Sequence, residues 1–296
     1  MMVSQLVVGL LAGAMLAGAA GAQSPVPENG GAELPAFVVP AHEWKPGEAI
    51  EDADDLLVAL ETADLGITTF KADVRYTRVF ALAGDEQVRD GALYFETVDR
   101  GDEQTPALRR FAVLFTSLRV GSRVEKEPKD YIFDGQYLVE RLEKSRDFIK
   151  RRVVAPGERV DPLRIGEGPF PVPVGQRRSE VLERYEARLA PAAEGLEAES
   201  LVKFVTGAKE SDGTWQLVLT PRVEAKKADE QTEIRVWYRR SDLLPRLAIT
   251  TTLAGDVSIV QMLNPEKNPK QMPHRVFDTA VPARGWNVRL EEYSSE

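Results

Sequence analysis

Residues 51–80 change abruptly from a helical hydrophobic period to an extended one, and this change limits the possible folds more than any other feature of the sequence. In the first part, Leu56, Leu57 and Leu60 recur at the spacing of one face of a helix. In the second part the period becomes two, so alternate side chains share one face of a strand. The apolar face of that strand carries Phe70, Ala72, Val74, Tyr76 and Phe80. An apolar helix followed by a long half-buried strand predicts a helix packed on the inner face of a curved sheet.

The rest of the chain supplies the strands of that sheet. Strands are predicted at 87–97, around the alternating Phe111, Val113 and Phe115, in a strand–turn series over 130–153, and at 201–205, 215–220, 233–239, 246–253 and 257–263. Residues 178–189 predict a helix that can give way to a strand from Tyr185. The Pro- and Gly-rich residues 156–176 predict a long crossing loop, and the tail after Phe277 predicts irregular structure. With about eleven strands and no βαβ alternation, the predicted class is mainly β (α+β).

Residues 1–22 have the features of a secretory signal peptide. They lack charged side chains, are rich in Leu, Val, Ala and Gly, and end in the small-x-small pattern Ala20-Gly21-Ala22, which predicts a mature start near Gln23. The chain contains no Cys, which excludes a lipid anchor at the cleavage site, a disulfide and a Cys-based metal site. We therefore expect an exported, soluble, periplasmic protein without a lipobox cysteine.

The mature chain divides into an arm and one domain. Residues 23–50 are rich in Pro, Gly and Ala and predict an extended arm, from which Trp44 either docks on the domain or stays loosely held. Residues 51–296 suit a single β domain, since barrels and sandwiches often run to about 200–250 residues. The net charge of −9 argues against nucleic-acid binding. We expect a monomer.

The sequence contains no catalytic motif. It has two His, both in predicted loops, and no HExxH, GxSxG, P-loop or dinucleotide-binding pattern. We therefore predict that the protein is not an enzyme and has no catalytic residues, no metal site and no cofactor. Arg109 and Arg110 need a separate explanation, because one of them must share the apolar face with Phe111 and Val113. A half-buried arginine needs a hydrogen-bond acceptor, and the commonest explanation for such a residue is a structural ion pair.

In this order, the elements resemble the LolA/LolB-like family of outer-membrane lipoprotein carriers over residues 53–288. The resemblance rests on the sequence and spacing of several short motifs. These are the helix before Ile67-Thr68-Thr69-Phe70-Lys71-Ala72, the strand Gly91-Ala92-Leu93-Tyr94-Phe95, Arg109-Arg110-Phe111, the hairpin Asp134-Gly135 followed by Tyr137-Leu138-Val139, Val218-Leu219-Thr220-Pro221, and the closing Phe277, Pro282, Gly285 and Val288. The chain departs from the compact carriers in its longer arm before Glu48 and in its longer loop over 156–176.

The resemblance implies an open, incomplete antiparallel β-barrel of about eleven strands, with helices covering the concave face. It implies that the apolar interior holds acyl chains of lipoproteins or lipids, taken from an inner-membrane donor and passed to an outer-membrane acceptor. It also implies an arginine in the third strand that locks the helical lid, for which Arg110 is the best match and Arg109 the alternative. The candidate cavity residues are Leu56, Leu60, Phe70, Ala72, Val74, Tyr76, Tyr94, Phe111, Val113 and Phe115.

Three alternatives to a carrier stay open from the sequence. The apolar residues could form a filled core instead of a cavity. A module of the same fold could recognise lipoproteins and a partner protein in envelope-stress sensing without ferrying them. An enzyme acting on cell-wall or lipid substrates would need a site that no motif indicates.

Overall fold

One sheet of twelve strands makes up most of the described chain. The computed structural model describes residues 44–45, 48–98, 108–154, 176–207, 213–224, 226–227, 229–273 and 275–293. These residues all belong to one unit, residues 39–296. The predicted signal peptide, both His residues and residues 156–175 of the predicted crossing loop lie outside the described residues.

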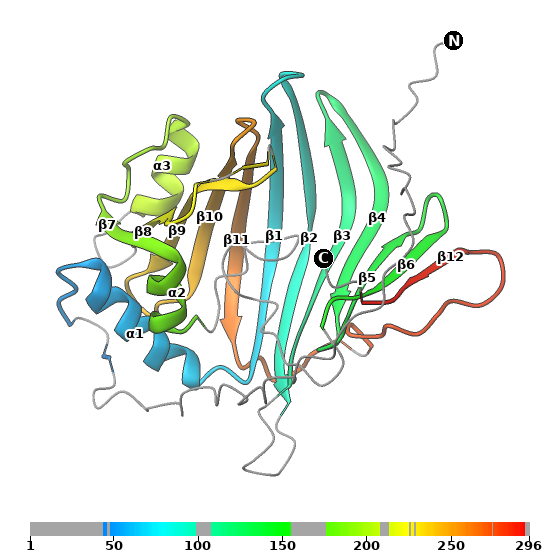
Figure 1. The fold of residues 1–296 in the computed structure, drawn as a ribbon, viewed down its shortest axis with the longest axis horizontal. Helices are drawn as coiled ribbons and strands as arrows, with labels where there is room; N and C mark the ends of the chain where they lie inside the picture. The colour runs from blue at the N-terminus through cyan, green and yellow to red at the C-terminus, as the bar shows by residue number, and fades with distance from the viewer. Residues whose placement is uncertain are drawn as a thin grey trace, which may run out of the picture. The chain divides into compact units, whose positions relative to one another are not determined.

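The first strand of the chain, β1 (Thr69–Phe80), lies in the middle of the sheet, between β2 (Asp85–Val98) and β11 (Val257–Lys267). The remaining strands are β3 (Leu108–Val120), β4 (Arg123–Phe133), β5 (Tyr137–Leu142), β6 (Asp147–Arg152), β7 (Tyr185–Ala190), β8 (Thr214–Pro221), β9 (Gln231–Arg239), β10 (Pro245–Thr252) and β12 (Asn287–Glu291). The order across the sheet is β12-β6-β5-β4-β3-β2-β1-β11-β10-β9-β8-β7 (Figure 1). The two edge strands, β12 and β7, do not pair with each other in the described chain, so the sheet is not closed. The predicted open, mainly β fold is confirmed.

The helix that the spacing of the leucines predicts before β1 is present. α1 (Ala53–Leu65) is capped by Asp52, whose Oδ1 accepts a 2.9 Å hydrogen bond from the backbone N–H of Asp55. α2 (Arg178–Arg184) ends directly before β7, which confirms the predicted change from helix to strand at Tyr185. α1 contacts α2, β7 and β8. The two helices pack on the same face of the sheet, which we call the helix face, and the opposite side we call the back face.

The helix face carries the largest apolar cluster of the described chain. α1 contributes Leu56, Leu57 and Leu60, each at most 2% exposed. Ile50 belongs to the cluster and Trp44 packs against it, so the end of the predicted arm is docked on the domain. In Figure 1, α1 and α2 lie in front of the part of the sheet formed by β7–β10, and no helix of the described chain lies in front of β2–β4.

The third helix corrects the prediction of a strand at 201–205. The segment is α3 (Glu199–Thr206), and it packs against Trp237 and Leu247 on the back face. Its apolar contacts come from Leu201, Phe204 and Val205. These positions are three and four residues apart, which is the spacing of a helix face and not the alternation of a strand. In so short an apolar run, the sequence does not distinguish this helical spacing from the alternation of a strand.

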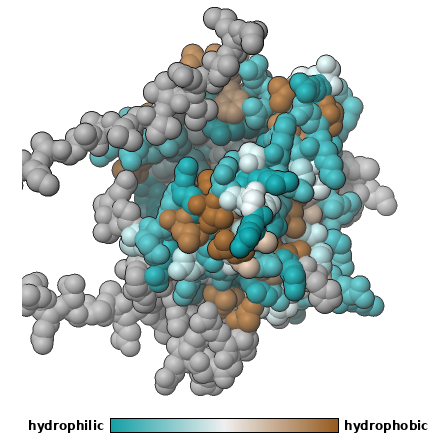
Figure 2. Space-filling model, turned by 90° about the vertical axis from the view of Figure 1, so that its right-hand side faces the viewer, coloured by the Kyte–Doolittle hydropathy of each residue, from teal (hydrophilic) through white to brown (hydrophobic). Residues whose placement is uncertain are grey.

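The chain after residue 277 is more regular than predicted, because it ends in the edge strand β12. This strand pairs with β6 in parallel, whereas all other neighbours in the sheet are antiparallel. Its Val288 and Leu290 are 42% and 61% exposed. Figure 2 looks onto this side and shows apolar side chains gathered among hydrophilic ones.

Among the described helices, none has the length and apolar character that crossing a membrane requires.

Candidate functional site

Most of the predicted cavity residues meet in the apolar cluster of the helix face. The cluster contains Leu56, Leu60, Phe70, Ala72, Val74, Phe111, Val113 and Phe115, and Tyr76 packs against it. The alternation predicted for β1 is therefore confirmed, since Phe70, Ala72 and Val74 are 0%, 0% and 4% exposed. Such burial also shows that this part of the face is filled by its own neighbours.

Tyr94 is the predicted cavity residue that the structure places elsewhere. It opposes Lys71 on β1 and Ala112 on β3, and it packs with an apolar cluster of the back face. Its neighbour Phe95 is the residue of β2 that belongs to the helix-face cluster. The motif of five apolar and small residues at 91–95 does not alternate, so the sequence did not show which side chain points inward.

Arg109 and Arg110 lie on opposite faces of β3. The guanidinium carbon of Arg109 lies 5.2 Å from the ring centre of Phe95, on the helix face. Arg110 opposes Glu96, and its Nε donates a 2.7 Å hydrogen bond to the Glu96 carboxylate. The guanidinium carbon of Arg110 also lies 4.5 Å from the ring centre of Phe277. The predicted lid-locking residue is therefore on the back face, and Arg109 is the arginine that shares the face of the helices.

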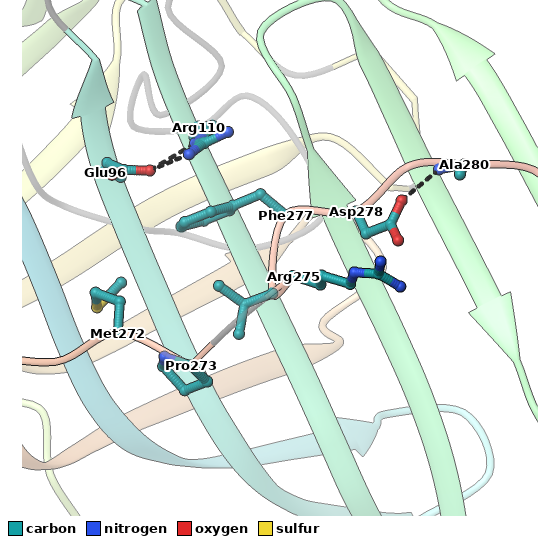
Figure 3. A pocket seen from close by; sticks show the side chains of 9 residues that line it. Glu96, Arg110, Met272, Pro273, Arg275, Phe277, Asp278 and Ala280 are labelled. Carbon is teal, nitrogen blue, oxygen red and sulfur yellow. Dashed lines mark hydrogen bonds and ion pairs between the residues drawn. The ribbon is translucent and has the colours of Figure 1, made fainter.

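Arg110 contributes to a back-face cavity of about 620 Å³ under the segment that precedes β12 (Figure 3). The cavity is lined by Glu96, Arg110, Met272, Pro273, Arg275, Val276, Phe277, Asp278 and Ala280. Figure 3 shows the Arg110–Glu96 pair on β3 and β2, with Phe277 beside it on the segment that precedes β12. Arg110 thus stabilises the position of the C-terminal segment on the sheet.

On the helix face, the side chains of β1–β4 form rows that cross the four strands. The first row is Phe70, Phe95, Phe111 and Phe133; the second is Ala72, Leu93, Val113 and Tyr131; the third is Val74, Gly91, Phe115 and Lys129. Two shorter rows follow on β1 and β2, first Tyr76 with Arg89 and then Arg78 with Gln87. The face therefore changes from fully apolar at one end to aromatic and cationic at the other.

Gly91 interrupts the third row because a side chain does not fit there. A Cβ at this position would lie 2.7 Å from the Cα of Phe115 and closer still to the carbonyl oxygen of Leu114. Gly91 stands at a β-bulge, where the β2–β3 register shifts between Asp90 and Gly91. The absence of a side chain lets the backbones of β2 and β3 approach closely at the point where the apolar rows end.

A cavity of about 300 Å³ lies at the cationic end of the helix face, and we call it the rim cavity. It is lined by Tyr76, Arg78, Phe80, Gln87, Arg89, Phe115, Lys129 and Tyr131. The rings of Tyr76 and Tyr131 lie 6.0 Å and 6.5 Å from the ring of Phe115, measured between centroids. The rim cavity is thus continuous with the apolar cluster, to which Phe115 belongs.

The cations of the rim cavity are held by carboxylates outside its lining. Arg89 donates a 2.7 Å hydrogen bond to Glu127, which holds the pKa of that carboxyl below its ordinary value. The ammonium of Lys129 lies 3.7 Å from the Glu140 carboxylate and 4.6 Å from the ring centre of Tyr131. Burial lowers the pKa of Lys129 and raises the pKa of Tyr131. Within the described ranges, no group of three or more Asp, Glu or His side chains is placed to hold a metal ion.

The polar residues of this cavity are not among those predicted from the sequence. Arg78 and Arg89 continue the inward alternation of β1 and β2, and Lys129 continues that of β4. The sequence carries a signal for Arg78, since its position and that of Phe70 differ by an even number, which puts both side chains on the same face of β1. Cations near strand ends are usually solvated, which is why the alternation was not followed that far.

No protein-family model matches the sequence, and no curated protein matches it. Solved structures are similar to it in fold. One contains MucA and MucB of Pseudomonas aeruginosa, with 15% identity, 76% of this chain and 60% of that chain covered, and a TM-score of 0.38. Another is a LolA superfamily protein of Nitrosomonas europaea, with 11% identity, coverages of 77% and 98%, and a TM-score of 0.29. A third is an outer-membrane lipoprotein-sorting protein domain of Vibrio parahaemolyticus, with 10% identity, coverages of 76% and 95%, and a TM-score of 0.32. The family that the sequence resembles is thus represented among these structures.

Proposed function

We propose that this protein binds acyl chains of lipids or lipoproteins at the rim cavity and carries them in the periplasm for outer-membrane lipoprotein sorting. The observation that carries the proposal is the junction of the apolar rows with an open cavity walled by the rings of Tyr76, Phe115 and Tyr131. Its volume is at the lower end of the range of about 300–1,000 Å³ that is typical of ligand sites. The periplasmic location follows from the export signal predicted for residues 1–22.

Acyl-chain burial supplies the affinity in this proposal. Each methylene removed from water contributes about 0.8 kcal/mol. An acyl chain held in the rim cavity would lie against the rings of Tyr76, Phe115 and Tyr131. The proposed activity is binding, and the rings, cations and one amide that line the cavity are groups that can hold a ligand.

The test uses a neutral acyl probe, a pyrene-labelled fatty alcohol, and native mass spectrometry of protein isolated from cell envelopes. We expect saturable uptake of the probe and a co-purifying lipid. Gln87→Trp places a ring in the rim cavity and should abolish uptake. Gln136→Trp makes the same change at an exposed turn and should leave uptake unchanged. Absence of both uptake and co-purifying lipid would refute the proposal.

A second candidate function is recognition of a partner protein without lipid transfer. The observation that favours it is the edge strand β12, whose Val288 and Leu290 are exposed beside backbone groups that could accept another strand. Transfer of a labelled lipoprotein from this protein to acceptor membranes separates the two candidates. Uptake followed by transfer supports the carrier, whereas uptake without transfer supports the binding module.

A further inference from the structure

The lining of the rim cavity contains three cations among four aromatic side chains. They are Arg78, Arg89 and Lys129, and they come from three different strands. No carboxylate is among the cavity's described lining residues. A neutral acyl chain gains nothing from these charges, so the acyl-binding function does not by itself explain them.

Each of the three cations has hydrogen-bonding capacity beyond its carboxylate partner. Arg89 donates to the side chain and the backbone oxygen of Glu127, and a guanidinium has five N–H groups. The ammonium of Lys129 meets Glu140 at 3.7 Å, which is longer than a hydrogen bond, and it has three N–H groups. Arg78 meets Asp256 at 3.4 Å through one nitrogen and is stacked on Phe80. Donors of this number and charge suit a carboxylate or a phosphate.

The aromatic side chains of the same cavity limit what can carry that anion. Phe115 is 2% exposed, and its ring contacts those of Tyr76 and Tyr131, which stand beside Arg89 and Lys129. A ligand that satisfies both the cations and the rings has an anionic group and a hydrocarbon chain.

We propose that Arg78, Arg89 and Lys129 bind the anionic headgroup, carboxylate or phosphate, of an acylated ligand whose chain lies against Tyr76, Phe115 and Tyr131. This inference rests on the proposed function and specifies the ligand class of the same site. It gives the bound ligand a direction. The headgroup lies at the cationic end of the helix face, and the acyl chain points toward the row of phenylalanines.

The test compares ligands that differ only in the headgroup. Oleate, oleyl alcohol, dioleoyl phosphatidic acid and inorganic phosphate are titrated against the full protein by displacement of the neutral pyrene probe and by calorimetry. We expect oleate to bind at least about tenfold more tightly than oleyl alcohol, since a charge-assisted hydrogen bond in a partly buried site contributes that much. Oleate and phosphatidic acid together show whether the site prefers a carboxylate or a phosphate headgroup.

The cation is tested with Lys129→Met, which keeps the length of the side chain. Glu140 retains Arg151 at 3.9 Å in this variant, so no carboxylate is stranded. We expect the preference for oleate over oleyl alcohol to fall to about twofold or less. Lys129→Arg should keep the preference, and Lys71→Met, which removes a charge on the back face of β1, should also keep it. If Lys129→Met does not fold, Arg78→Gln at the exposed end of the cavity takes its place.

Three results would overturn the inference. Equal binding of oleate and oleyl alcohol by the unaltered protein removes the headgroup site and leaves acyl binding intact. An unchanged preference in a folded Lys129→Met or Arg78→Gln variant places the anion elsewhere. Inorganic phosphate that binds as tightly as oleate marks a site for free anions and not for lipid headgroups. Failure of every acyl ligand, oleyl alcohol included, refutes the proposed function itself and is thereby distinguishable.

Discussion

The row of Phe70, Phe95, Phe111 and Phe133 and the rim cavity lie on the same face of the same four strands, yet one is filled and the other is open. In the row, each phenylalanine is at most 2% exposed. At the rim, the same alternation places Arg78, Arg89 and Lys129 around a cavity of about 300 Å³. Gly91 stands between the two regions and contributes no side chain.

This difference teaches that the apolar character of a half-barrel face is not by itself a sign of a binding cavity. Where large side chains meet from several strands and from α1, they fill the space and stabilise the fold. Where long cations and partly exposed rings replace them, the sheet keeps its backbone pairing but the face stays open. The rows that fill the core and the rows that line the proposed binding site are therefore different rows of the same strands.

The largest expected effect separates the two regions by one matched substitution. Phe95→Ala empties a fully buried position and should lower the free energy of unfolding by about 3–5 kcal/mol. Phe80→Ala removes the same ring at the rim, where it is partly exposed, and should cost about 1 kcal/mol or less. Urea unfolding of both variants measures the difference. Equal losses would show that the rim is as tightly packed as the phenylalanine row.

The boundary between the regions is tested at Gly91. Gly91→Ala should cost about 2–3 kcal/mol, because the first carbon of any side chain meets the backbone of Leu114 and Phe115, which cannot move without disturbing the β2–β3 pairing. Gly91→Val should cost little more, since the clash is already present at the Cβ. A stepwise rise from Ala to Val, with Ala nearly silent in thermal unfolding, would contradict the close approach.

A third pair of variants adds the same ring to each region. Ala72→Trp overpacks a residue that is 0% exposed and should cost about 1–3 kcal/mol. Gln87→Trp places the ring in the rim cavity and should change stability by less than about 0.5 kcal/mol. Thermal unfolding of both variants is the measurement. A stable Ala72→Trp protein would mean that the cavity extends into the second row.

The smallest expected effect is the pH dependence of stability that comes from the Arg89–Glu127 pair beside the rim cavity. Because the hydrogen bond from Arg89 lowers the pKa of Glu127 from its ordinary 4.5, the unfolded chain takes up this proton at a higher pH than the folded one. The contribution is therefore present above pH 4.5 and is lost as the pH falls through the lowered value. Stability measured by urea unfolding between about pH 3 and pH 7 should fall more in the unaltered protein than in Glu127→Gln. Parallel curves would show that the pair does not stabilise the folded state.

The sheet was predictable wherever burial on one side produced alternation. Phe70, Ala72 and Val74 predicted the inward face of β1, and the helix α1 followed from the spacing of its leucines. The structure shows α3 in place of the predicted strand, because a segment of eight residues is too short to separate a helical period from an extended one. β12 was missed because a parallel partner at the sheet edge adds no local pattern to the sequence.

The candidate site was less predictable than the fold, for two physical reasons. Tyr94 was placed on the wrong face because Gly91, Ala92 and Leu93 do not alternate in polarity. The cavity itself depends on how rows from β1, β2, β3 and β4 meet, which is a property of the register and not of any single strand.

The central position of β1 has a consequence for the way the chain folds. One edge of β1 pairs with β2, which follows it after a short turn, whereas the other pairs with β11, so that Val79 meets Val257. Closing so long a stretch of chain costs configurational entropy before any contact compensates for it, which slows folding. Until residues 257–267 arrive, β1 is an unpaired edge next to an uncovered apolar face, a form that associates readily with other chains. The second edge of β1 therefore stays exposed until β11 has formed. A chaperone that covers β1 during that interval would raise the yield of native protein.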